Sequence, residues 1–346
     1  MTNAAPLPGA LAALDEAPFF QAGLQGYSDG PMRILARRLG APYCVTESLL
    51  DETLLRGGKG LQSAELDAED HPIAGQIIGT CPETMARAAE ILLELGHDAI
   101  DVNLACPVKK MRGLCRGGHL LTRPDVAREI LTAVRDAVGG RVPVTVKLRR
   151  GFDEESASRT RFFEVLESVV ELGFAAATVH GRTVEQKYEG LSSWTFLEEV
   201  TQRFPDLPVF GSGDIYEAQD IFRRIRESGV RGVSVARGAI GNPWIFRQAR
   251  EIQRGEPPSL PTVADQRRVI EEHFELSVRF LGESAAGRML RKLGIRFSRH
   301  HPRQPEVWQA FVDMKTTQDL ARIFERYYAD GEEAAAGSQR LRDLTG

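Results

Sequence analysis

The chain has 346 residues, 42% of them hydrophobic, and a formal net charge of −4. This length and composition are typical of a globular protein with one barrel-sized domain and a smaller appendage. No segment approaches the ~18 consecutive apolar residues that span a bilayer, so we expect no membrane role. The charge gives no indication of nucleic-acid binding by itself, because net charge says nothing of local patches.

The N-terminal segment 1–16 is rich in Ala and Pro and lacks the basic start and apolar run of a signal peptide. We expect it to be a flexible tail of a cytoplasmic protein. The chain has four cysteines and no C-x-x-C pair; they are Cys44, Cys81, Cys106 and Cys115. This pattern predicts reduced thiols and no zinc or iron–sulfur site.

Apolar or β-rich runs alternate with amphipathic helical patterns up to residue 252. The predicted strands are 19–24, 43–46, 73–78, 99–104, 142–148, 175–179, 209–210 with its flanks, and 232–235. The predicted helices are 31–39, 82–95, 124–138, 161–172, 194–204, 217–228 and 244–252. Such alternation indicates a parallel sheet, and eight units over roughly 250 residues predict a TIM (β/α)8 barrel rather than an open doubly wound sheet.

After the Pro-rich segment 255–258 the pattern changes to helices alone. Helical spacing of apolar residues covers 269–280, 286–300, 305–314 and about 320–329, which predicts a small helical bundle. We therefore expect a tail over 1–16, a barrel domain over 17–254, a helical domain over 255–334 and a frayed C-terminus over 335–346.

Basic residues recur in this helical region at spacings that can line one helix face; they are Arg288, Arg291, Lys292, Arg296 and Arg299. A charged run is usually a solvated face, so a solvated face and a phosphate-binding face both stay open.

A lone thiol, Cys106, lies two residues after the apolar run 98–104 and directly precedes a proline. An isolated cysteine is often a small buried hydrophobe. Here Lys109, Lys110 and Arg112 come next, and cations beside a thiol lower its pKa and can bind phosphate groups. The segment therefore favours a reactive thiol at a strand end.

Residues at the carboxyl ends of nearly every predicted strand are polar or charged. With one glycine among them, these residues are Gln76, Asn103, Cys106, Lys147, Arg149, His180, Arg182, Ser212, Gly213, Asp214 and Arg237. Catalytic groups of TIM barrels lie at the carboxyl ends of the strands, so this convergence predicts an active site there.

Two glycine-bearing turns, 211–214 and 236–241, follow the seventh and eighth predicted strands, where TIM barrels build phosphate sites. Backbone N–H groups and Arg237 suit a phosphate-bearing cofactor. Lys147 and His180 would then face its other end, where a cation can stabilise the negative charge of a reduced flavin. A nicotinamide would need no such partner.

Motifs spread over the barrel give the chain a family resemblance. They are Ser28-Asp29-Gly30-Pro31-Met32-Arg33, Thr46-Glu47, Gln76-Ile77-Ile78-Gly79, the run 101–110 (DVNLACPVKK), Val144-Thr145-Val146-Lys147-Leu148-Arg149, Val179-His180-Gly181-Arg182-Thr183 and Gly241-Asn242-Pro243-Trp244-Ile245-Phe246. In order and spacing they resemble the tRNA-dihydrouridine synthases, flavin enzymes that use NADPH and FMN to reduce uridines in RNA. The helical tail resembles the RNA-binding domain of that family more loosely.

The resemblance implies roles by position. Cys106 would be the general acid. The FMN contacts would be Gly23, Leu24, Gln25, Gln76, Lys147, His180, Ser212, Gly213, Asp214, Ala236 and Arg237. The substrate would be contacted by Asn103, Arg149, Lys109, Lys110 and Arg182, with Asn103 and Arg149 facing the uracil. A monomer, tRNA as partner and no metal complete the expectation.

The first-strand exit departs from the family's Ala-Pro-Met-Ala-Gly, because Ala22-Gly23-Leu24-Gln25-Gly26 stands there. Ala105 and Ala236 stand where Gly is usual. One added methyl group should trim the fit of each turn without abolishing phosphate binding, whereas Gln25 places a polar group near the flavin.

Reduction of the uracil C5–C6 bond needs a hydride at C6, for which the reduced flavin N5 is a source, and a proton at C5. A thiol, with an ordinary pKa of about 8.5, suits the proton. A stacked base must leave its stack to reach a barrel mouth, which needs phosphate contacts outside the pocket. The alternatives are a flavoenzyme for free pyrimidines, similar to dihydroorotate dehydrogenase, and a flavin-less RNA-binding protein that retains the fold.

Overall fold

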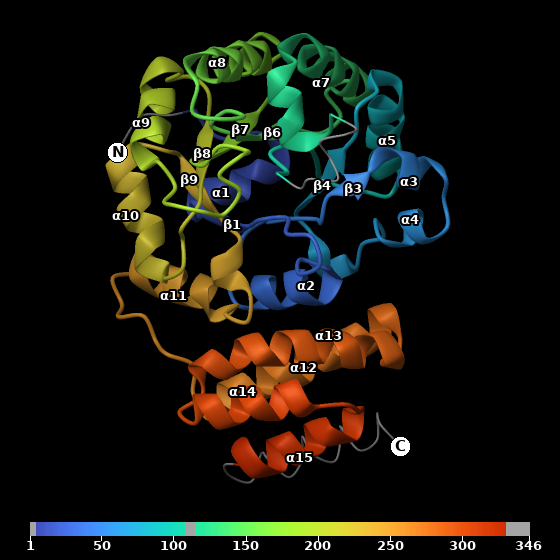
Figure 1. Ribbon diagram of the computed structural model, residues 1–346, viewed down its shortest axis with the longest axis vertical. Coiled ribbons are helices and arrows are strands. Elements are labelled where there is room, and N and C mark those ends of the chain that lie inside the picture. The colour runs from blue at the N-terminus through green and yellow to red at the C-terminus, as the bar shows by residue number, and fades with distance from the viewer. Residues whose placement is uncertain (1–4, 108–114, 330–346) are drawn as a thin grey trace. The chain divides into compact units, whose positions relative to one another are not determined.

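A computed structural model describes residues 5–107 and 115–329. The chain divides into two compact units, one from residues 1–28 and 41–237 and the other from residues 29–40 and 238–346 (Figure 1). The first unit contains every strand that the structure describes, and the described part of the second is helical.

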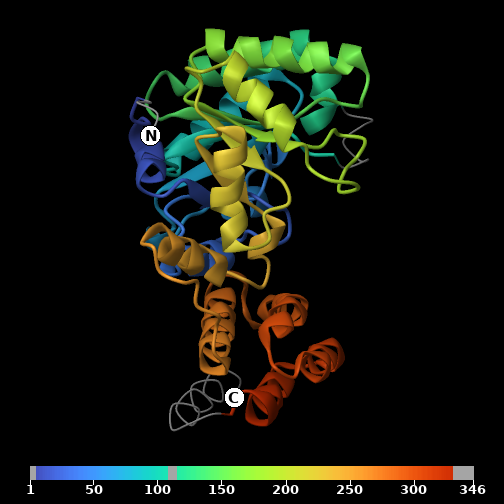
Figure 2. The same cartoon turned by 90° about the vertical axis from the view of Figure 1, so that its left-hand side faces the viewer.

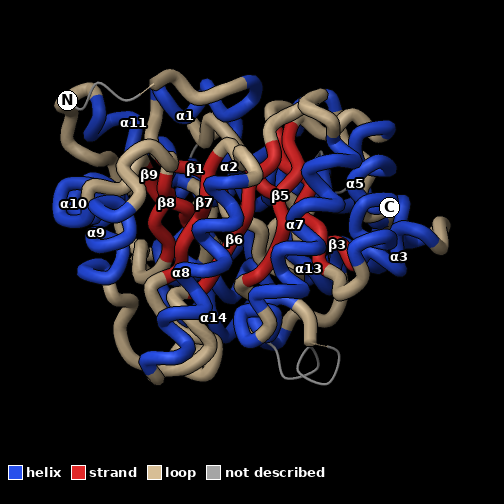
Figure 3. Tube along the Cα trace, turned by 90° about the horizontal axis from the view of Figure 1, so that it is seen from above, coloured by secondary structure: helices blue, strands red, loops and turns tan. Residues whose placement is uncertain are grey.

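The strands form one parallel sheet in the order β2-β1-β9-β8-β7-β6-β5-β4-β3. Their bounds are β1 Phe19–Gln21, β2 Cys44–Val45, β3 Leu49–Leu50, β4 Ile73–Ile78, β5 Ala99–Leu104, β6 Val144–Arg149, β7 Ala176–His180, β8 Val209–Ser212 and β9 Gly232–Val235. Because β2 also pairs with β4, all strands but β3 close into a barrel. Figure 3 shows the strands inside a layer of helices. The predicted TIM barrel is confirmed.

Every helix that the sequence predicts up to residue 252 is present, and the described residues add three short helices over 13–16, 51–55 and 59–62 that the sequence does not predict. The helices of the first unit are α1 Ala13–Glu16, α3 Asp51–Leu55, α4 Lys59–Gln62, α5 Pro82–Glu94, α7 Pro124–Val138, α8 Ser156–Glu171, α9 Trp194–Arg203 and α10 Ala218–Ser228. Proline starts α5 and α7, where the missing N–H costs nothing, and Gly139 ends α7 in the left-handed conformation. These caps explain why the predicted and observed bounds of both helices agree closely.

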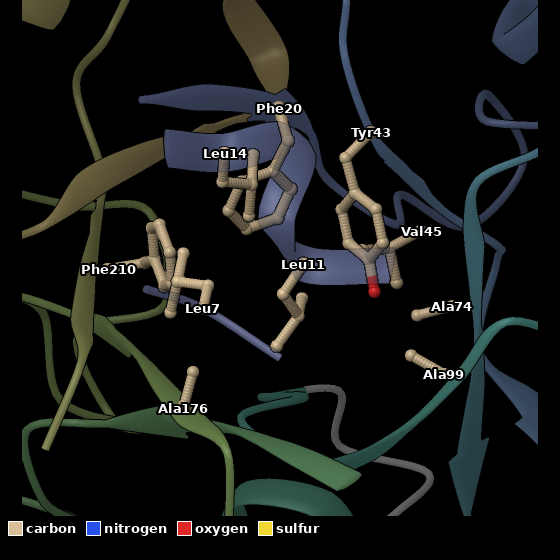
Figure 4. Close-up of a cluster of buried hydrophobic side chains, with 10 residues drawn as sticks. All are labelled: Leu7, Leu11, Leu14, Phe20, Tyr43, Val45, Ala74, Ala99, Ala176 and Phe210. Atoms are coloured by element: carbon tan, nitrogen blue, oxygen red, sulfur yellow. The ribbon is translucent and has the colours of Figure 1, made fainter. Parts of the chain in front are cut away.

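The N-terminal segment corrects one prediction, because residues 7–16 are not a flexible tail. A 3-10 turn (Gly9–Ala12) leads into α1, and Leu7, Leu11 and Leu14 are buried in one hydrophobic cluster. Figure 4 shows these leucines among side chains from the strands and the loops before them. Those side chains are Phe20, Tyr43, Val45, Ala74, Ala99, Ala176 and Phe210. The segment therefore fills the amino-terminal end of the barrel, since burying its leucines outweighs the ordering entropy of a short segment.

The second unit collects helices from two parts of the chain. They are α2 Gly30–Arg38, α11 Trp244–Gln253, α12 Val263–Leu281, α13 Glu283–Phe297, α14 Gln304–Asp313 and α15 Thr317–Tyr327 (Figure 2). Packing is close where glycine permits it, because a Cβ at Gly294 of α13 would lie 2.2 Å from the Phe311 ring of α14. The sequence places α2 and α11 in the barrel domain, whereas here both group with the C-terminal helices. The predicted frayed C-terminus lies outside the described residues.

Candidate active site

A cavity of about 280 Å³ lies at the carboxyl ends of the barrel strands. It is lined by Gly23, Leu24, Gln25, Ser48, Asn103, Ala105, Cys106, Pro107, Lys147, Arg149, His180, Tyr188, Ser212, Gly213, Asp214, Ile215, Tyr216, Ser234, Ala236 and Arg237. Strand register explains why these positions converge, since Asn103 pairs with Lys147, Arg149 with His180, and His180 with Ser212.

The cavity contains most of the residues that the sequence singles out. Gln76 lies behind Asn103 in the barrel interior rather than in the cavity lining. Arg182 is also absent from the lining, and its guanidinium is buried in an ion pair. Lys109 and Lys110 lie outside the described residues.

Cys106 is half-buried on the cavity wall, two residues beyond the end of β5. Its backbone is anchored on both sides: its N–H donates to Oδ1 of Asn103 (3.0 Å), and its carbonyl accepts from the N–H of Gly118 (3.1 Å). The thiol is therefore presented by a backbone of defined position. Ala105 also donates to Oδ1 of Asn103, at 2.9 Å.

A chain of buried polar side chains leads from this anchor into the barrel. Nδ2 of Asn103 donates to Oε1 of Gln76 (2.7 Å) and to the hydroxyl of Ser48 (2.6 Å). Nε2 of Gln76 donates to Oδ2 of Asp101 (2.7 Å), whose Oδ1 accepts from the Thr145 hydroxyl (2.6 Å). Sequence reasoning missed Asp101, which lies within a strand rather than at its end.

Lys147 and Asp101 lie close enough inside the barrel for their charges to interact. Burial lowers the pKa of the Lys147 ammonium, and the nearby charge of Asp101 acts in the opposite direction. Burial likewise raises the pKa of the Asp101 carboxyl, against the hydrogen bonds from Thr145 and Gln76. Each group thus supports the charged form of the other.

Arg149 binds backbone rather than offering a free guanidinium. It donates to the carbonyls of Ala105 (2.9 Å), Thr183 (2.8 Å) and Lys187 (2.7 Å). Burial lowers the pKa of Arg149 to about 10, so it remains a cation at neutral pH. It holds the loop after β7 against the Cys106 segment while lining the cavity.

His180 is a neutral hydrogen-bond donor to the cavity. Burial lowers the pKa of its imidazole well below 6.5, and the charges of Arg149, Lys147, Arg182 and Arg237 lower it further. Nδ1 accepts from the backbone N–H of Arg182 (3.1 Å), so Nε2 carries the proton in the neutral ring.

Asp214 organises the turn after β8. Its carboxylate accepts twice from Arg182 (2.7 and 2.8 Å) and once from the N–H of Ser192 (2.8 Å), and Arg237 lies 3.3 Å from it. Arg182 and Arg237 both form ion pairs with Asp214, and the Arg237 side chain stays 32% exposed where it lines the cavity. Gly213 turns the chain at φ +116°, where a Cβ would lie 2.3 Å from the Ser192 hydroxyl. Only glycine fits this turn.

Two half-exposed tyrosines at the cavity were also missed by sequence reasoning. The Arg237 guanidinium lies 5.1 Å from the ring centre of Tyr188 and 5.4 Å from that of Tyr216, in the range of cation–π contacts. Both tyrosines lie in loops without strand or helix periodicity, so only their closeness to the 180–183 and 211–214 motifs could have indicated them.

The altered first-strand exit lines the cavity through Gly23, Leu24 and Gln25. The turn is closed by the N–H of Leu24, which donates to the Ser28 hydroxyl (2.7 Å). The Gln25 amide donates to Glu47 (3.1 Å), so its polar group is held by a neighbouring loop.

Two further findings concern the described residues as a whole. They contain no cluster of three or more His, Cys, Asp or Glu side chains placed to hold a metal ion. No helix in the described part of the chain combines the length and apolar character needed to cross a membrane.

Comparison with known proteins gives both a family and a fold. The family model of dihydrouridine synthase (Dus) matches residues 20–330. The chain is 33% identical over 314 residues to tRNA-dihydrouridine synthase B of Xanthomonas axonopodis pv. citri (strain 306), covering 89% of this chain and 92% of the relative. It is 34% identical over 327 residues to tRNA-dihydrouridine synthase B of Pseudomonas aeruginosa, covering 91% and 94%.

Two solved structures share the barrel at low identity. Histamine dehydrogenase from Rhizobium sp. 4-9 superposes with a TM-score of 0.55 and 15% identity, over 75% of this chain and 49% of that one. Morphinone reductase in complex with tetrahydroNAD superposes with a TM-score of 0.51 and 14% identity, over 75% and 93%. These likenesses concern the fold, whereas the family model and the closer relatives carry the assignment: this chain belongs to the dihydrouridine synthase family.

Proposed function

We propose that this protein reduces uridine to 5,6-dihydrouridine in tRNA, with FMN as cofactor and NADPH as reductant. The observation that carries the proposal is the convergence of the Cys106 thiol with Lys147, His180 and Arg237 on one cavity. Family membership and relatives named tRNA-dihydrouridine synthase support it. A thiol that can donate a proton, the cationic side chains of Lys147 and Arg237, and the neutral imidazole of His180 thus surround the same cavity.

The donor set of the cavity fits FMN, which is rich in acceptor oxygens and carries a phosphate. Arg237 with the turns at Ser212 to Asp214 and Ala236 would hold the phosphate, and Lys147 and Nε2–H of His180 would hold the ring. The buried Ser234 hydroxyl also lines the cavity and has no partner among the described residues. When bound, FMN supplies the hydride for C6 of the uracil.

Cys106 would deliver the proton to C5. The thiolate that remains lies close enough to Lys147 and Arg149 for their charges to interact with it. Both cations therefore stabilise the product of proton transfer, and solvent restores the proton before the next turnover. General-acid catalysis of this kind contributes typically ~10²–10⁴-fold in rate.

The helical unit would bind the RNA backbone. The side chains of Arg288, Arg291 and Arg296 are exposed on α13. The buried side chains of the same helix, Leu290, Leu293 and Phe297, point into the interior of the helical unit. This segregation leaves the cations to solvent, where phosphates can reach them. Lys109 and Lys110 belong to the same proposal.

The test separates the two half-reactions by stopped-flow absorbance of the flavin. We expect Cys106→Ala to be reduced by NADPH as fast as wild type, and to be reoxidised by tRNA ~10²–10⁴-fold more slowly. Cys115→Ala is the matched control, since its thiol bonds the His119 carbonyl and lines no part of the cavity. Equal losses in both variants would contradict the role of Cys106.

The same assay tests the other candidates. Reoxidation by free uridine or orotate but not by tRNA would favour a free-pyrimidine enzyme. A protein that takes up no FMN at micromolar concentration yet binds tRNA would favour a flavin-less RNA-binding protein.

A further inference from the structure

The hydrogen-bond chain from Asp101 to Cys106 has only one polarity that satisfies all of its members. The backbone N–H groups of Ala105 and Cys106 can only donate, so Asn103 must turn its oxygen toward them. Its amide nitrogen then faces Gln76, which must present Oε1.

Gln76 consequently turns its own NH2 group into the barrel, where it needs an acceptor. Asp101 supplies that acceptor through Oδ2, at 2.7 Å. The direction set at the backbone of Cys106 therefore ends on the one carboxylate of this chain of bonds, and neither amide can flip without placing two donors or two acceptors face to face.

Burial makes the loss of any one of these hydrogen bonds costly. The exposed fractions of Gln76, Asp101 and Asn103 are 1%, 4% and 7%. Water has little access to replace a lost partner, so an amide whose acceptor is removed must stay unsatisfied or reorient.

We propose that Asp101 is a positioning residue that holds Cys106 in its place on the cavity wall, acting through the amides of Gln76 and Asn103. The proposal rests on the proposed function for the chemistry of Cys106, whereas the positioning itself is a property of the chain. Asp101 lies two residues before Asn103 on β5, one layer below the cavity.

Two substitutions separate hydrogen-bond direction from charge. Asp101→Asn keeps an oxygen for Gln76 and turns its NH2 toward the Thr145 hydroxyl, which can accept. Asp101→Leu leaves no acceptor, so Gln76 either keeps an orphaned NH2 or flips and breaks its bond to Asn103. Rescue by the asparagine variant would distinguish positioning from mere loss of the buried charge.

The first readout needs neither cofactor nor RNA. We expect hydrogen exchange of the Ala105 and Cys106 amides in the FMN-free protein to quicken by at least about tenfold in Asp101→Leu and to stay near wild type in Asp101→Asn. Asp51→Leu is the matched control, because Asp51 is a buried carboxylate bonded to Thr84 and outside the chain of bonds.

The second readout is reoxidation of the reduced enzyme by tRNA. A thiol displaced by about 1 Å should slow this step by about 10–100-fold in Asp101→Leu, while Asp101→Asn stays within about threefold of wild type. Reduction by NADPH should change less than reoxidation does. If Asp101→Leu does not fold, Gln76→Met removes the same directional signal one step nearer to Cys106.

The outcomes are distinct. Unchanged exchange at Ala105 and Cys106 in Asp101→Leu, or an asparagine variant as impaired as the leucine variant, would overturn the proposal. If the variants show the expected differences in hydrogen exchange but the wild-type enzyme does not reduce uridine in tRNA, the proposed function is contradicted and the positioning role of Asp101 stands.

Discussion

Leu7, Leu11 and Leu14 form a plug that fills the amino-terminal end of the barrel. Truncating one leucine of this plug gives a quantitative test of how that end of the barrel is built. Leu11 is 2% exposed and belongs to a cluster with Leu7, Leu14 and residues of the strands. A Leu→Ala change at such a site costs about 2–5 kcal/mol, because the cavity it leaves collapses only in part. We take about 3 kcal/mol, which lowers the Tm of a unit of roughly 200 residues by about 6–12 °C.

The assay is thermal unfolding of Leu11→Ala and wild type, each with and without FMN. The plug cluster and the active-site cavity share no residue, so FMN should raise both melting temperatures by a similar amount. Leu191→Ala is the control, since Leu191 is 84% exposed and should shift Tm by no more than about 2 °C. If Leu11→Ala melts like wild type, residues 7–16 do not fill the barrel and the expectation of a flexible tail was right.

Three further predictions concern the helical unit and the site. Neutralising Arg288, Arg291 and Arg296 should lower the slope of log tRNA affinity against log salt by up to about one unit per cation, without changing flavin reduction; an unchanged slope would make the cluster a solvated face. Because the pKa of folded His180 lies well below 6.5, the unfolded chain binds the extra proton below that pH and stability falls on acidification. The urea concentration at the midpoint of unfolding should therefore fall less for His180→Asn than for wild type between about pH 7.5 and about pH 5. An equal fall in both proteins would refute the lowered pKa of His180. Gly213→Ala should weaken FMN binding in a fluorescence titration by at least about tenfold, whereas Gly173→Ala, also at positive φ but in open space, should not.

Much of the fold follows from local sequence because the barrel repeats one unit. Each strand is a short apolar run and most helices carry their own start or stop signal, as Pro82 and Gly139 do. Helix α8 begins at Ser156, five residues before its predicted start, because its polar first turn carries no apolar periodicity. Local signals thus place elements well and their polar ends less well.

Strand ends also reveal which side chains can reach the cavity, but not what those side chains bind. Arg182 is polar, follows β7 and matches a family motif, yet it pairs with Asp214, which lies 32 residues further along the chain. Asp101 escaped notice because it lies inside a strand, and its partners come from two other strands. Such pairings depend on register across the barrel, which no single segment encodes.

The N-terminal plug, by contrast, did carry a readable signal. Leu7, Leu11 and Leu14 are spaced four and three residues apart, as on one face of a helix. The surrounding alanines and prolines hid this pattern, since their composition is typical of disordered segments.

The most direct test of the central claim is nucleoside mass spectrometry of unmodified tRNA incubated with the FMN-loaded protein and NADPH. The proposed function predicts that dihydrouridine forms with wild type, depends on NADPH, and drops by ~10²–10⁴-fold in initial rate with Cys106→Ala. If NADPH reduces the bound flavin but no dihydrouridine forms in the tRNA, the assignment of tRNA uridine as the substrate is contradicted.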